Sequence, residues 1–287
     1  MTSVSILSKP STLGLSLLLL GAGLLIGVPA YLSLPLGLTL LYRIGTSVFL
    51  LLLILLSRNR EGWLPYRPVL FGFFGVSLGI GLAWVIGERP LDWLGLTTST
   101  PQGAALAKLT SEAIPICAAI LLVNWLGGND PAYLKLRRGI LASSLGLGLL
   151  SSVIILIAFI ATGGLQSFLK VPTNELLSWI PWIMIFSLAN GFMEELWFRG
   201  SWLSNFGGLV GTNAALHVTS WIFILWHVIN YWNEPIALAI FFAVFIYIAY
   251  IYALITRKTG TLWGAILAHS IADFVFVMGA FASGVSL

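Results

Sequence analysis

The sequence predicts an all-α, polytopic integral membrane protein, and the composition, the mean hydropathy and the length of the apolar stretches support this prediction. Of 287 residues, 59% are hydrophobic and only 8% are charged, whereas soluble domains have about 45–50% apolar and about 25% charged residues. The mean hydropathy is +0.99. These values exclude a soluble enzyme and a disordered chain. A membrane helix needs about 20 mostly apolar residues, and we expect about eight to nine such helices here.

Nine apolar stretches meet this length requirement. In chain order they are 13–34, 38–57, 67–87, 104–126, 139–162, 177–204, 210–232, 235–256 and 260–284. The first is too long for a signal peptide and has no clear cleavage site, so we expect an uncleaved helix. Glycines in the third, over 72–81, favour close packing of helices. The polar connections 88–103 and 163–176 are interpreted as interfacial helices or loops.

Basic residues gather in loops that share one side of the membrane if every stretch crosses it. They are Lys9; Arg58, Arg60 and Arg67; Lys135, Arg137 and Arg138; and Arg257 and Lys258. Because cytoplasmic loops carry excess Lys and Arg, we expect a cytoplasmic N-terminus and a C-terminus on the opposite side. The compact size and the lack of a targeting extension favour a bacterial plasma membrane. The net charge of +4 follows from these loops and predicts no nucleic-acid partner.

Ionisable and polar groups deep inside the apolar stretches are the most informative residues. An ionisable group at the centre of a membrane helix costs at least about 2.5–3.5 kcal/mol, so such groups are rare and usually functional. Most of them follow the fifth stretch, and only Arg43 and Glu112 precede it. The later set is Asn190, Glu194, Glu195, Arg199, His217, His227, His269 and Asp273.

Helical spacing sorts this set into pairs. Side chains four positions apart share a helix face, as do Glu195 and Arg199, and His269 and Asp273. We expect Arg199 to neutralise Glu195. Glu194 is then left to face an inner cavity together with Asn190, four positions before it.

One carboxylate and two imidazoles near mid-membrane suit hydrolytic chemistry. A carboxylate such as Glu194 can act as a general base toward water. The imidazoles of His227 and His269 can ligate a metal or stabilise a developing oxyanion. Two His and a Glu also suit catalytic zinc, and a metal-free carboxylate mechanism fits the same residues. Asp273 is expected to orient His269 or to hold the oxyanion. We expect the site to open toward the side of the basic loops.

Three sequence motifs resemble those of the CPBP family, which comprises type II CAAX prenyl endopeptidases and bacteriocin-processing or Abi membrane proteins. Residues 194–200 read EELWFRG and resemble its EExxxR motif. Residues 223–227 read FILWH and resemble FxxxH, and residues 269–273 read HSIAD and resemble HxxxN or HxxxD. The three motifs occur in the family's order, each within an apolar stretch. The resemblance covers roughly residues 177–284, so we divide the chain into N-terminal membrane helices of unassigned role (1–176) and a CPBP-like core (177–287).

The resemblance implies a function and a set of roles. It implies a glutamate-dependent intramembrane endopeptidase of the metalloprotease type, in which Glu194 activates water. His227 and His269 would bind that water, the scissile carbonyl or a metal, and Glu195 and Arg199 would form a positioning ion pair. The substrate would be a peptide or a lipid-modified protein in contact with membrane lipid. The CAAX endopeptidases have Asn at the last motif position, where an amide can donate to an oxyanion and an ionised Asp cannot.

Other functions stay open from the sequence alone. A buried polar network that only joins helices, and a transporter that relays protons or binds ions, would use the same residue types. Some CPBP members are regarded as scaffolds or immunity proteins. A serine protease is disfavoured, because Ser283 lacks a His base. The remaining groups have simpler interpretations: His217 as a polar helix-end histidine, Glu112 with Lys108 as a surface pair, Arg43 as a snorkelling or internally paired cation, and Cys117 as an inert thiol.

Overall fold

The computed structural model describes residues 11–27, 34–229 and 233–284, and within them the chain is helical without strands. The α-helices are α1 Thr12–Gly27, α2 Leu36–Ser57, α3 Arg67–Ile86, α4 Arg89–Leu94, α5 Pro101–Leu106, α6 Ile114–Leu126, α7 Leu141–Ala161, α8 Gly164–Phe168, α9 Thr173–Glu195, α10 Leu203–Val210, α11 Thr212–Val228, α12 Pro235–Thr259 and α13 Trp263–Ala282. A 3₁₀-helix, η2 (Glu61–Tyr66), precedes α3, and two π-helices, η3 (Ala107–Ala113) and η4 (Leu196–Trp202), follow α5 and α9.

The prediction of an all-α polytopic membrane protein is confirmed. Seven helical segments of the described chain are long and apolar enough to cross a membrane. The stretches predicted at 13–34 and 210–232 contain shorter helices, α1 with 16 residues and α11 with 17. Lys9, residues 28–33 and residues 230–232 lie outside the described residues. The two polar connections contain the short helices α4 and α8, and α9 already begins at Thr173.

The longest segment is the run of α9, η4 and α10 from Thr173 to Val210. It extends past the predicted stretch 177–204 at both ends. It begins after Pro172 and ends at Gly211, whose φ of +84° a helix cannot accommodate. The π-helix in its middle starts directly after Glu195. π-helical turns occur often at functional sites, and this one contains Arg199 and directly follows the two glutamates.

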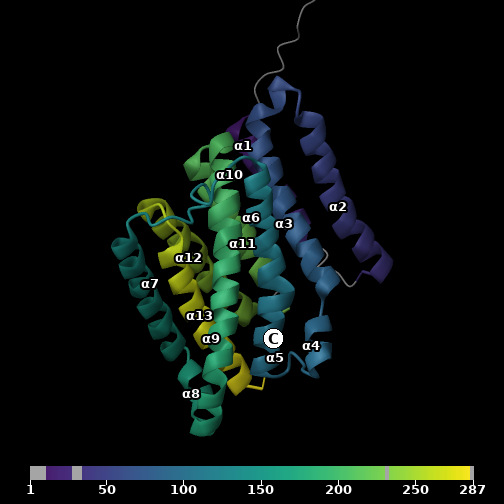
Figure 1. Cartoon of the computed structure of the whole chain (residues 1–287). Helices are drawn as coiled ribbons and strands as arrows, with labels where there is room; N and C mark the ends of the chain where they lie inside the picture. Colours follow the sequence, from purple (N-terminus) through teal and green to yellow (C-terminus); the bar gives the residue numbers. More distant parts are fainter. Residues whose placement is uncertain (1–10, 28–33, 230–232, 285–287) are drawn as a thin grey trace, which may run out of the picture.

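Figure 1 shows the helices packed side by side, with α2 at one edge of the bundle and α7 at the other. α13 packs on both α7 and α9, α3 packs on α6, and α11 packs on α12 and α1. α9, α11 and α13, which carry the three motifs, therefore lie together in the part of the bundle that other helices cover.

Small residues bring several helices into close contact, as the glycines in 72–81 predicted. A Cβ on Gly79 would lie 2.7 Å from the Ile116 Cα, so α3 and α6 meet backbone to backbone there. The same device joins α7 to α13, where a Cβ on Gly148 would lie 3.0 Å from the Gly264 Cα. Such small-residue contacts are typical of helix packing in membranes. The second contact fixes the position of the helix that carries His269.

Candidate active site

Three helices place the sequence-predicted polar residues around one point. α9 contributes Asn190, Glu194 and Glu195, and α13 contributes His269 and Asp273. The remaining two are His227 near the end of α11 and Arg199 within η4. Because α9 packs on α13 and η4 packs on α11, residues more than 70 positions apart in sequence meet in a single cluster.

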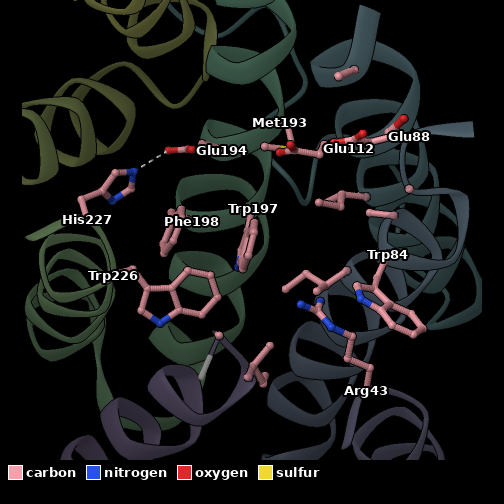
Figure 2. A pocket seen from close by; sticks show the side chains of 18 of the residues that line it. Arg43, Trp84, Glu88, Glu112, Met193, Glu194, Trp197, Phe198, Trp226 and His227 are labelled. Carbon is pink, nitrogen blue, oxygen red and sulfur yellow. Dashed lines mark ion pairs between the residues drawn. The ribbon is translucent and has the colours of Figure 1, made fainter. Parts of the chain in front are cut away.

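Glu194 lies between the two motif histidines. Its Oε2 is 3.5 Å from Nε2 of His227 and 3.7 Å from Nε2 of His269. The same oxygen is buried without a hydrogen-bond partner. Figure 2 shows the Glu194 carboxylate pointing at the His227 ring. A buried, unsatisfied carboxylate oxygen is costly, so this atom is arranged to contact something that the polypeptide does not supply.

The His227 ring is fixed by its own helix and by aromatic neighbours. Its Nδ1 lies 2.7 Å from the carbonyl oxygen of Phe223. A carbonyl only accepts, so Nδ1 carries a hydrogen and donates it. The ring stacks at 4.2 Å on Phe223 and lies 4.7 Å from the Phe245 ring. Nε2 is therefore the nitrogen of His227 that faces Glu194 and can change its bonding.

The His269 ring is fixed by Glu195, a contact that the sequence analysis did not anticipate. Its Nδ1 lies 2.7 Å from Glu195 Oε1, and both side chains are almost wholly buried. The Arg199 guanidinium donates to the same oxygen at 2.8 Å. Arg199 pairs with Glu195, as the spacing predicted, and the same carboxylate oxygen accepts the hydrogen from His269. Nε2 of His269 is then turned toward Glu194 and Asp273.

Arg199 anchors this arrangement in the core. Its side chain is 2% exposed, and it donates to the Ala249 carbonyl oxygen at 3.2 Å. Its guanidinium also lies over the Phe223 ring at 4.5 Å. Hydrogen bonds and a cation–π contact compensate for burying the charge. One arginine thus fixes Glu195 and contacts the aromatic ring on which His227 stacks.

Asp273 and Asn190 form a pair that joins α13 to α9. The Asn190 amide nitrogen donates to Asp273 Oδ2 at 2.9 Å. Asn190 was expected beside Glu194 because the two are four positions apart, yet its amide instead reaches across to α13. Asp273 was expected to orient His269 or to hold the oxyanion, and the Nδ1 of that ring is bound by Glu195. Asp273 Oδ1 lies 3.7 Å from the other nitrogen, Nε2.

The donor chemistry of this cluster fits a zinc ion. Both rings are held through Nδ1, so both present Nε2 to the same buried carboxylate oxygen, and metal-binding histidines are typically held in this way. Zinc bonds of about 2.0–2.2 Å place neighbouring ligand atoms of a tetrahedral shell about 3.3 Å apart, close to the measured 3.5 and 3.7 Å. In the described part of the chain, no group of three or more His, Cys, Asp or Glu side chains is arranged so that it could hold a metal ion, so the fit concerns the chemistry of the donor atoms alone.

A cavity of about 570 Å³ adjoins the cluster. Its wall includes Glu194 and His227 from one half of the chain, and Arg43, Trp84 and Ser111 from the other. Figure 2 shows Arg43 and Trp84 on the side of the cavity that faces Glu194 and His227. Glu88, which is exposed, also lines the cavity. It follows the C-terminal end of α3, whereas the basic residue Arg67 lies at the N-terminal end of the same helix. The cavity therefore approaches the surface away from the basic loops, not on their side as the sequence analysis expected.

His217 and the pair Lys108–Glu112, which were also discussed from the sequence, lie outside the cluster. His217 is exposed, and its Nδ1 is 3.0 Å from the Tyr250 hydroxyl, outside the cluster. Lys108 donates to Glu112 at 2.6 Å, so the predicted pair exists. It is not a plain surface pair, because it lies on the π-helix η3, its Lys108 side chain is 17% exposed, and Glu112 lines the cavity.

A protein-family comparison agrees with the motifs. Residues 176–275 match the family model described as type II CAAX prenyl endopeptidase Rce1-like. This segment belongs to the CPBP family. The match begins within α9, ends within α13 and includes all three motifs, about a third of the chain. Neither the curated proteins nor the solved structures gave a match to the chain.

The CPBP match carries a family-level conclusion. The type II CAAX prenyl endopeptidases are membrane proteases, so at the level of the family the match supports a CAAX-type intramembrane protease with a protein substrate in the membrane. The seven membrane-spanning segments agree with that location.

Proposed function

We propose that the protein is a glutamate-dependent intramembrane endopeptidase in which Glu194 activates the attacking water. One observation carries the proposal: Glu194 Oε2 is buried without a hydrogen-bond partner and faces Nε2 of both His227 and His269. A water molecule at this point can donate to the carboxylate and to an imidazole nitrogen. The adjoining cavity gives a peptide access to the same carboxylate.

The chemistry follows from these positions. Glu194 takes a proton from the water as its oxygen attacks the scissile carbonyl carbon. The resulting carboxyl group returns that proton to the amine nitrogen as the carbon–nitrogen bond breaks. His227 and His269 act through Nε2, where each ring can hold the water or, when protonated, donate to the oxyanion.

Zinc fits the same atoms of the chain. His227 Nε2, His269 Nε2 and the Glu194 carboxylate would hold it, and a bound zinc would polarise the carbonyl and acidify water. Asp273 Oδ1 is 3.7 Å from the same His269 Nε2, so this carboxylate would lie beside the atoms that hold the ion. The proton transfers assigned to Glu194 are the same with or without the ion.

Glu195 and Arg199 position the reacting groups and do not touch the substrate. Glu195 is held by Arg199 and in turn holds His269 Nδ1. This fixes the tautomer and the orientation of the ring, as the carboxylate partners of metal-binding or catalytic histidines do.

We assign separate parts to the two regions of the chain. Residues 177–287 supply the reacting groups, and residues 1–176 supply the facing wall of the cavity. The lining supports this division, because α2, α3 and η3 contribute Arg43, Trp84 and Ser111 opposite Glu194 and His227. The substrate is a peptide or lipid-modified protein that enters from the membrane.

We also propose a bacterial plasma membrane as the location and a cytoplasmic N-terminus as the orientation, and the contacts among the basic loops support the orientation. The Arg137 side chain donates to the Gly260 carbonyl oxygen at 2.8 Å, so the loops at 135–138 and 257–260 touch. Tyr133 donates to Asn205 at 2.9 Å, and α10, which carries Asn205, packs on η2 beside Arg67. Three basic clusters thus lie at one end of the bundle, as the positive-inside rule requires of cytoplasmic loops.

Single substitutions test the function. Glu194→Ala, His227→Ala and His269→Ala should each lower the cleavage of a defined mixture of synthetic apolar peptides by at least about 100-fold, with products detected by mass spectrometry. His217→Ala is the matched control, because this histidine is exposed and lies outside the cluster. All four proteins should insert into membranes. Loss of insertion in the three site variants alone would favour a purely structural polar network.

A further inference from the structure

Arg43 is a cation in the cavity wall without a counter-charge. It lies on α2, outside the segment matched by the family, and its Nε is buried without a hydrogen-bond partner. None of the ion pairs in the described part of the chain includes it. Its one charge-directed contact is the Trp84 ring, 6.0 Å from the guanidinium carbon.

An unpaired arginine within a membrane helix raises the free energy of the folded protein, so its presence calls for a functional reason. An arginine at the centre of a membrane helix costs at least about 2.5–3.5 kcal/mol and normally pairs inside the protein or reaches the membrane surface. In the described part of the chain Arg43 has no ion-pair partner, and its side chain lines the same cavity as Glu194 (Figure 2). A cation kept unpaired in a ligand-sized cavity is arranged for an anion that the ligand brings.

The acidic side chains of the cavity do not serve as that anion. Glu112 is bonded to Lys108 at 2.6 Å, and Glu88 is exposed. Figure 2 places both beside each other at an edge of the cavity away from Arg43. Trp197, Phe198 and Trp226 line the wall between Arg43 and His227. Among the described residues that line the cavity, Arg43 is therefore the one arginine or lysine, and aromatic side chains surround it.

We propose that Arg43 binds a carboxylate of the peptide substrate and so fixes which bond lies at Glu194. A guanidinium forms paired, parallel hydrogen bonds with a carboxylate, and a cavity of about 570 Å³ lies within the usual range for bound ligands, about 300–1,000 Å³. The carboxylate is either the C-terminal group of the peptide or an acidic side chain near the scissile bond. This assignment of substrate chemistry rests on the proposed function.

Binding to matched peptides tests the proposal without requiring cleavage. The full chain carrying Glu194→Gln, in lipid nanodiscs, is titrated with acetylated Leu-Ala-Leu-Ala-Leu bearing a free C-terminal carboxylate and with its C-terminal amide. A second pair, both amidated, carries Asp or Asn at the central position. We expect the acid member of one pair to bind about tenfold tighter than its neutral twin, as one charge-assisted bidentate contact allows. The pair that shows the difference identifies the source of the carboxylate.

Adding Arg43→Gln should abolish that difference and leave the neutral peptides unaffected. Arg60→Gln is the matched control, because Arg60 is an exposed arginine after α2, and it should preserve the preference. Arg43→Lys keeps the charge without the fork and should retain a smaller preference; it decides the matter if Arg43→Gln does not fold.

The assignment is overturned if the acid and neutral peptides bind with equal affinity when Arg43 is intact, or if no peptide binds at all. It is also overturned if the preference for the acid peptide survives in Arg43→Gln. An undiminished preference in Arg43→Lys would overturn it as well. The proposed protease function fails separately, through unchanged cleavage in Glu194→Ala, and that result would leave these affinities measurable.

Discussion

Glu195 Oε1 lies 2.7 Å from the Nδ1 of His269, which makes the second glutamate of the motif the partner of a histidine 74 positions later. The same oxygen accepts from Arg199 at 2.8 Å. Two adjacent glutamates of the motif therefore have different roles. Glu194 faces the cavity, and Glu195 holds the ring that faces Glu194 from α13.

Removing the charge of Glu195 should affect both stability and reaction. Glu195→Gln leaves Arg199 buried without a counter-charge, which typically costs about 3–5 kcal/mol. It also releases the His269 ring, and loss of such a partner typically lowers activity by about 10–100-fold. Thermal unfolding in detergent and kcat for a cleaved peptide measure the two effects. Glu175→Gln, an exposed acid in the first turn of the same helix, should change neither, and a Glu195 variant with wild-type kcat would contradict the positioning role.

At Asp273, hydrogen bonding should matter more than charge. Asp273→Asn still offers an oxygen to the Asn190 amide, which now donates at 2.9 Å, and adds a donor that can reach an oxyanion. We expect its cleavage rate to stay within about tenfold of wild type. Asp273→Leu leaves a buried donor unsatisfied, at a cost of about 1–3 kcal/mol, and should be at least tenfold slower than the Asn variant. Equal loss in both variants would show that the negative charge itself is required.

Close packing of α7 on α13 should be sensitive to a single methyl group. The added Cβ of Gly148→Ala would lie 3.0 Å from the Gly264 Cα, and forcing extra methyl groups into a packed interface costs about 1–3 kcal/mol. A Cβ on Gly146, on the same helix, would meet nothing within 4 Å. We therefore expect Gly148→Ala to lower the unfolding temperature and Gly146→Ala to preserve or raise it. Identical unfolding temperatures would contradict the packing.

Metal removal should leave the fold intact, because the two histidines are held by protein atoms. His227 Nδ1 is bound by the Phe223 carbonyl and His269 Nδ1 by Glu195. Treatment with a strong chelator should leave the unfolding temperature unchanged; a large fall would reveal a structural metal instead. Cleavage that is lost and then restored by zinc assigns the ion to the reaction, whereas retained cleavage assigns the reaction to Glu194 and the imidazoles alone.

The sequence predicts the local features of this molecule well. Apolar length predicts the helices, and spacing of four predicts the ion pairs Glu195–Arg199 and Lys108–Glu112, because both depend only on helix geometry. The contact of Glu195 with His269 depends instead on how α9 and α13 are rotated about their axes. No local pattern encodes that rotation, so Asp273, the neighbour of His269 on its own helix, was assigned the role that Glu195 takes.

The direction in which a lone side chain points was equally hidden. Arg43 lies in a helix whose sequence shows no partner, and only the packing of α2 on α3 directs it into the cavity. No recognisable sequence pattern predicted the two π-helices either. One of them, η4, directly follows Glu195 and joins α9 to α10.

We propose that Glu194 makes this protein a protease. This proposal is tested by comparing the new protein termini in cells that express the wild type with those in cells that express Glu194→Ala. Cells express the wild type or Glu194→Ala at equal levels, with both proteins folded in the membrane, and mass spectrometry identifies the termini that differ. If Glu194 activates the attacking water, some termini will occur with the wild type alone, and these termini will also identify the candidate substrates. Identical sets of termini in the two cell populations would contradict it and would favour a scaffold or transport function.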